Sequence, residues 1–162
     1  MTTILWDIDG PLNPQFATDL VERKFLHVNE GYASWNIDVI NHGQWMRHLE
    51  KLTTMVWCSA WLNDSNVLAT YYMLENHMDF VDLYDSIEPG TNPDEGMWKL
   101  PAVKEYLHKS VEPIIWLDDE FTPDAFQWAE NRGNTLLILC DPAIGWTYEQ
   151  YQQMLEFIEL HK

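Results

Sequence analysis

The chain has 162 residues, of which nine are Lys or Arg and 26 are Asp or Glu, so its formal net charge is −17. Apolar residues make up 46% and charged residues 22%, a composition that indicates a folded globular protein and excludes a disordered chain. Bulk nucleic-acid binding is disfavoured, because phosphate neutralisation needs a surface rich in Lys and Arg. A small phosphorylated ligand needs only one or two cations and stays compatible with this charge.

The length suits a single domain over residues 1–162. The longest apolar runs, such as 136–140, are too short to span a bilayer, and residues 1–4 have neither the basic region nor the long apolar stretch of a signal peptide. We therefore expect a cytoplasmic protein with no membrane contact. Cys58 and Cys140 each close an apolar run, which favours buried free thiols over a disulfide.

Five short, nearly continuous apolar runs predict strands that are buried on both faces. They span residues 3–6, 55–58, 80–83, 113–117 and 135–140. Apolar residues at helical spacing lie between and after them, at 43–52, 63–74, 98–107, 123–131 and 147–161. This alternation predicts an α/β fold: a three-layer, Rossmann-like domain whose mostly parallel five-stranded sheet has helices on both faces.

The insertion at about 14–41 interrupts this alternation after the first strand. Segments 24–28 and 32–37 are rich in aromatic and β-branched residues and flank a turn that contains Gly31, which predicts a β-hairpin. The hairpin is either a solvated excursion or a flap over a site at the end of the first strand. In the second case Trp35 and Trp61 could flank the site and stack on a ring, although packing is the ordinary role of a single Trp.

Carboxylates gather where the predicted strands end. Asp7 and Asp9 follow the first strand, and Asp118 and Asp119 follow the fourth. Ligands of parallel α/β sheets bind at the carboxyl ends of the strands. Several carboxylates in one place need a compensating cation, and Mg²⁺ prefers such oxygen ligands together with a substrate phosphate. The pattern therefore predicts a magnesium site.

Four motifs in this order resemble those of the haloacid dehalogenase (HAD) superfamily. An apolar strand runs into Asp-Ile-Asp-Gly at 4–10, and a second strand ends in a hydroxyl residue at 56–59. Lys99 lies at the start of the helical segment 98–107, with Lys104 as a competitor, and an apolar strand runs into Asp-Asp at 114–119. The resemblance covers roughly residues 3–140 and implies a capless, HAD-like phosphatase fold.

The resemblance also implies a mechanism. Asp7 would attack phosphorus and form an aspartyl-phosphate. Asp9 would protonate the leaving oxygen and then deprotonate the hydrolytic water. Ser59 and Lys99 would hold the phosphoryl oxygens.

The metal ligands implied by the resemblance surround the same two strand ends. Mg²⁺ would lie between Asp7, the backbone carbonyl of Asp9 and Asp118, with Asp119 bound directly or through water. A response-regulator receiver also combines acidic residues with Lys and Ser or Thr, but its acidic pair comes first in the chain, which is the opposite order.

No cap domain fits in 14–41 or in the loop 84–97, so an open site is expected. Such a site suits a large phosphorylated partner, or a small one if another subunit covers it, which leaves a homo-oligomer open. The leading hypothesis is a Mg²⁺-dependent phosphomonoesterase. The alternatives are a nucleotide or nucleic-acid-end phosphatase with the same chemistry, and a non-catalytic HAD-like binding module.

Overall fold

The computed structural model describes residues 1–14, 25–31, 33–85 and 96–162. Its strands are β1 (Thr3–Trp6), β2 (Leu26–Glu30), β3 (Ala33–Ile37), β4 (Thr54–Trp57), β5 (Asp79–Phe80), β6 (Ile114–Asp118) and β7 (Thr135–Leu139). Its helices are α1 (Asn41–Glu50), a 3₁₀ turn (Leu62–Ser65), α2 (Asn66–Tyr71), α3 (Leu100–Tyr106), α4 (Pro123–Arg132) and α5 (Tyr148–Leu160).

The central sheet has five parallel strands in the order β5-β4-β1-β6-β7. The chain builds outward from β1 through β4 to β5, and then returns to the other side of β1 to add β6 and β7. Strand order therefore reverses at β1, and such a switch point is where open α/β sheets bind ligands. Trp6 is in register with both Trp57 and Leu117, so β1, β4 and β6 end at the same level.

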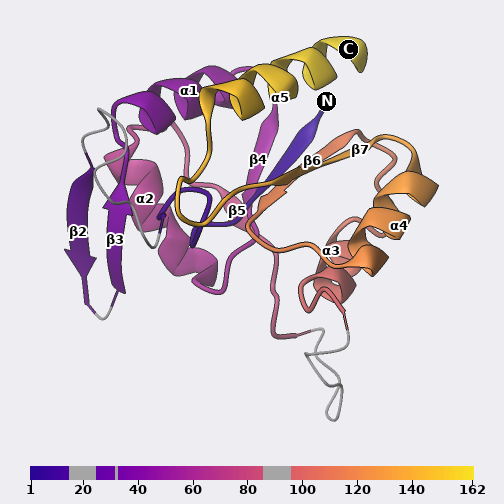
Figure 1. Cartoon of the computed structure of the whole chain (residues 1–162), viewed down its shortest axis with the longest axis horizontal. Coiled ribbons are helices and arrows are strands. Elements are labelled where there is room, and N and C mark those ends of the chain that lie inside the picture. The colour runs from indigo at the N-terminus through magenta and orange to yellow at the C-terminus, as the bar shows by residue number, and fades with distance from the viewer. Residues whose placement is uncertain (15–24, 32, 86–95) are drawn as a thin grey trace.

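Helices cover both faces of the sheet, as predicted (Figure 1). Side chains of successive β1 residues point to opposite faces. Ile4 and Trp6 belong to one buried cluster with residues of α1, α2 and α5, whereas Leu5 belongs to a second cluster with residues of α3 and α4. The result is an α/β domain of three layers that is compatible with a Rossmann-like fold.

Segments β2 and β3 form the predicted hairpin, an antiparallel pair separate from the main sheet. Gly31 at its turn has φ +59°, a left-handed conformation that glycine adopts without strain. Val28, Trp35 and Ile37 are buried in the cluster of α1 and α5, so the hairpin packs against the domain and is not a solvated excursion. Residues 15–24 of the expected insertion lie outside the described residues.

Trp35 does not have the substrate-stacking role considered for it. Its side chain is 1% exposed, and its ring meets the edge of Trp61 at a centroid distance of 5.2 Å and an interplanar angle of 73°. The alternation of the strand explains the burial, because His27 and Asn36 on the other face of the hairpin are exposed while Trp35 faces the core. Trp35 is a packing residue.

Two elements are markedly shorter than predicted, whereas the others agree with their predicted bounds to within a few residues. The third strand was expected at 80–83, but β5 is a two-residue edge strand because the Asp82 carboxylate accepts the backbone N–H groups of Tyr84 and Asp85 and turns the chain. The helix expected at 63–74 starts as the 3₁₀ turn and continues as α2 only to Tyr71.

The cysteine prediction is confirmed, because Cys58 and Cys140 are both buried and free. Among the described residues, no helix combines the length and the apolar composition that a membrane span requires. The predicted absence of a cap domain concerns in part residues 86–95, which the structure does not describe.

Candidate active site

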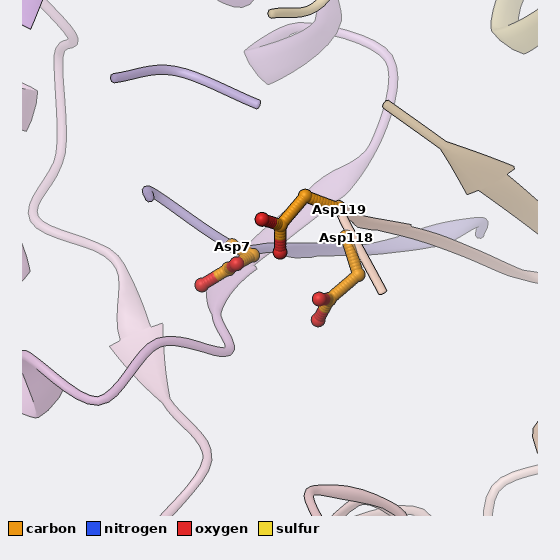
Figure 2. A group of neighbouring side chains, drawn as sticks. All are labelled: Asp7, Asp118 and Asp119. Atoms are coloured by element: carbon orange, nitrogen blue, oxygen red, sulfur yellow. The ribbon is translucent and has the colours of Figure 1, made fainter. Parts of the chain in front are cut away.

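Three carboxylates meet at the switch point of the sheet. Asp7 follows β1, Asp118 ends β6, and Asp119 comes next in the chain. One carboxylate oxygen of each lies within 4.8 Å of the others, and Figure 2 shows the three side chains gathered around the ends of the two strands. Asp7 is 4% exposed and Asp118 is 1% exposed, whereas Asp119 is partly exposed. The group could hold a metal ion, since oxygen atoms are what a hard cation prefers.

Lys99 lies inside this group. Its Nζ donates to Asp7 Oδ1 at 2.9 Å and to Asp118 Oδ2 at 2.8 Å, and the side chain is buried. Its rival Lys104 is exposed on α3. The fold therefore brings Lys99, and not Lys104, to the carboxylates.

Electrostatics of the group are dominated by burial. Burial raises the pKa of Asp7 to about 8, although Lys99 opposes this effect and Asp118 adds to it. Burial raises the pKa of Asp118 to about 6, again against Lys99. Burial alone would lower the pKa of Lys99, but Asp7 and Asp118 raise it.

Charge in the group is consequently unbalanced. Burial also raises the pKa of Asp119, so three carboxylates share the single ammonium group of Lys99. Removing carboxylates from water favours their neutral form unless a cation compensates them. An oxygen-only donor set with surplus negative charge is what a hard divalent cation requires, so the residues present fit such an ion.

A tight loop after β1 fits closely against Asp119. Gly10 has φ +98°, and a Cβ atom added to it would lie 2.5 Å from the Cβ of Asp119. Its N–H donates to the carbonyl of Asn13, whose own N–H donates to the carbonyl of Ile8. Gly10 is therefore required both by its backbone conformation and by the close approach of Asp119.

Asp9 points to other partners. Its Oδ1 accepts a hydrogen bond from Asn13 Nδ2 and its Oδ2 accepts one from Trp61 Nε1, both at 2.8 Å. Asp9 does not belong to the three-carboxylate group found among the described residues. The role of its backbone carbonyl as a metal ligand stays a prediction.

Ser59 follows β4 at the level of the carboxylates. It is 1% exposed, its carbonyl accepts the N–H of Leu62, and its Oγ accepts the N–H of Trp61 at a long 3.5 Å. These contacts resemble those of a residue that begins a helical turn. The predicted contact with a phosphoryl oxygen stays a prediction.

Sequence reasoning missed the two partners of Asp9. The sequence places Trp61 beside the site but does not identify it as a hydrogen-bond donor. Its position two residues after Ser59 is the signal that could have indicated an indole N–H directed at the site. Asn13 was not considered. The only signal was its place in a short loop between Pro11 and Pro14, four residues after Asp9.

Comparison with known proteins finds no family model, no curated protein and no solved structure that matches the chain. The resemblance to the HAD superfamily therefore rests on the four motifs alone.

Proposed function

We propose that the protein is a Mg²⁺-dependent phosphohydrolase of HAD type, which cleaves phosphomonoesters through an aspartyl-phosphate on Asp7. One observation carries the proposal: the buried Lys99 bridges Asp7 and Asp118 at the switch point of the sheet. Asp119 lies close enough to Asp7 and Asp118 for the three carboxylates to bind one metal ion. This arrangement places a carboxylate nucleophile beside the buried ammonium group of Lys99, and phosphoryl transfer depends mainly on positioning and on charge neutralisation.

In the first step an Asp7 oxygen attacks phosphorus while the bond from phosphorus to the ester oxygen breaks. Asp9 gives its proton to the leaving oxygen. In the second step a water oxygen attacks the same phosphorus and Asp9 takes the proton of the water. The bond from phosphorus to Asp7 breaks, which frees inorganic phosphate and restores the Asp7 carboxylate.

The remaining residues hold charge in place. Asp7, Asp118 and Asp119 would hold the metal ion, which when bound supplies positive charge to the phosphoryl oxygens. Lys99 and Ser59 bind the other phosphoryl oxygens. The substrate is a small phosphorylated molecule or the phosphorylated end of a larger one.

A panel of phosphate esters tests the proposal with wild type, Asp7→Asn and the control Asp79→Asn, each with Mg²⁺ and with EDTA. Asp79 is an exposed carboxylate on the edge strand β5. Asn there keeps an acceptor oxygen for the N–H of Phe80, and its Nδ2 can donate to the Tyr106 hydroxyl, which now donates to Asp79. We expect hydrolysis by wild type and by Asp79→Asn that EDTA abolishes. We expect none by Asp7→Asn with its fold intact. Wild-type rates in Asp7→Asn would disprove the assignment of the nucleophile.

A further inference from the structure

Both oxygens of Asp9 are engaged by groups that can only donate. The indole nitrogen of Trp61 has no lone pair to offer, and the Nδ2 of Asn13 is likewise a donor. The orientation of the Asn13 amide is fixed independently, because its Oδ1 accepts the backbone N–H of Asn36 at 2.8 Å. Together these two donors fix the orientation of both carboxylate oxygens of Asp9.

Both donors rest on the hairpin strand β3. Asn13 is 8% exposed and its amide bridges Asp9 to the Asn36 backbone. The ring of Trp61 packs edge to face on Trp35, which is itself buried. The position of Asp9 is thus fixed from two sides by side chains that β3 supports.

We propose that Trp61 and Asn13 are positioning residues that hold Asp9 as the base of the second half-reaction; this inference rests on the proposed function. In that step a water oxygen forms a bond to the phosphorus of phosphorylated Asp7, and the water proton passes to Asp9. The bond from this phosphorus to the Asp7 oxygen breaks, its electron pair returns to the Asp7 carboxylate, and inorganic phosphate leaves. Displacing the base by about 1 Å from its reactive position slows such a step on the order of 100-fold.

The step can be isolated with p-nitrophenyl phosphate and Mg²⁺. Because p-nitrophenolate leaves without a proton, formation of the aspartyl-phosphate does not need Asp9, whereas its hydrolysis does. The variants are Trp61→Phe, which keeps an aromatic ring without the N–H, and Asn13→Leu, which keeps the approximate size without the amide. Trp128→Phe is the matched control, since Trp128 is partly buried against Trp116 on the other face of the sheet.

We expect Trp61→Phe and Asn13→Leu to release a burst of nearly one p-nitrophenol per protein and then to turn over on the order of 10- to 100-fold more slowly than Trp128→Phe. The phosphorylated protein should be detectable by intact mass. Variants that match Trp128→Phe in both phases would overturn the inference. So would an equal loss of both phases, which is the result of a merely structural role.

A second readout does not depend on turnover and separates this inference from the proposed function. The indole proton resonance of Trp61, assigned by its loss in Trp61→Phe, should move upfield in Asp9→Ala, because the charged acceptor is gone. An unchanged resonance would overturn the inference. Wild type without activity on any ester would instead overturn the proposed function and, with it, the role assigned to Asp9 in hydrolysis.

Discussion

At the scale of single residues, the lysine between the carboxylates is the group on which the site depends most. Lys99 Nζ lies within 3 Å of both Asp7 and Asp118, and all three side chains are almost fully buried. A buried ion pair contributes little net stability compared with apolar residues of the same size, but losing one partner is costly. The lysine is therefore expected to affect folding as well as function.

Lys99→Met should destabilise the protein by about 3–5 kcal/mol, because it leaves buried carboxylates without their cation. Lys104→Met, the control on the exposed face of α3, should change the free energy of unfolding by less than about 0.5 kcal/mol. Chemical denaturation of both variants in EDTA measures the difference. Equal stabilities would mean that Lys99 is not paired as described.

At the scale of elements, the loop after β1 and the hairpin determine how the site is built. The loop brings Gly10 against Asp119 and lets Asn13 reach back to Asp9. The hairpin supplies the packing surface beneath Trp61. For each of these two elements we predict the effect of one substitution, and a similar residue elsewhere in the chain serves as the control.

Gly10→Ala should destabilise the protein and weaken Mg²⁺ binding, since the new methyl group would overlap Asp119. Gly31→Ala is the control: Gly31 also has a positive φ, but a Cβ there meets nothing within 4 Å. Backbone strain alone costs about 1–3 kcal/mol and applies to both variants. Calorimetric titration with Mg²⁺ should show weaker affinity only in Gly10→Ala. Unchanged affinity in that variant would show that Asp119 does not contribute to the metal site.

Trp35→Ala should cost roughly 3–5 kcal/mol of stability, as expected for a large aromatic residue cut out of a core. His27→Ala, on the exposed face of the same hairpin, should change stability little. Thermal melting compares the two variants. A small effect of Trp35→Ala would favour the flap role that its burial argues against.

At the scale of the whole molecule, the carboxylate group links stability to pH. The pKa values of Asp7 and Asp118, about 8 and about 6 in the folded protein, lie above the value near 3.9 of an Asp in an unfolded chain. At pH values between the unfolded and the folded pKa of each group, the folded state binds more protons than the unfolded state does. Stability is therefore highest in the acidic part of this range and falls as the pH rises from about 4 to 8.

In EDTA the melting temperature should fall between about pH 5 and pH 8 because of these two groups. Mg²⁺ competes with the protons, so its affinity should rise over the same interval and the protein with Mg²⁺ should lose less stability. Asp118→Asn, which cannot titrate, should give a flatter profile in EDTA. A melting temperature that rises across the interval in wild type would contradict the described burial of the group.

The amino-acid pattern was enough to predict the succession of strands and helices along the chain, the parallel sheet, the hairpin and the acidic residues that follow the strands. It could do so because buried parallel strands are short apolar runs, and because ligand-binding residues follow such runs directly. Asp7, Asp118 and Asp119 were therefore predictable as neighbours. The motif pattern favoured Lys99 over Lys104 but left both open, since both lie within the predicted helical segment 98–107.

Contacts between distant parts of the chain could not be predicted from the amino-acid pattern. Lys99 reaches Asp7 because the return of the chain places β6 beside β1, and Trp61 reaches Asp9 across 52 positions of sequence. Burial of Trp35 likewise depends on which face of the hairpin meets the domain. The periodicity of a sequence indicates which residues share a face of a strand or helix, but not which other element that face packs against. The packing of separate elements determines the second point.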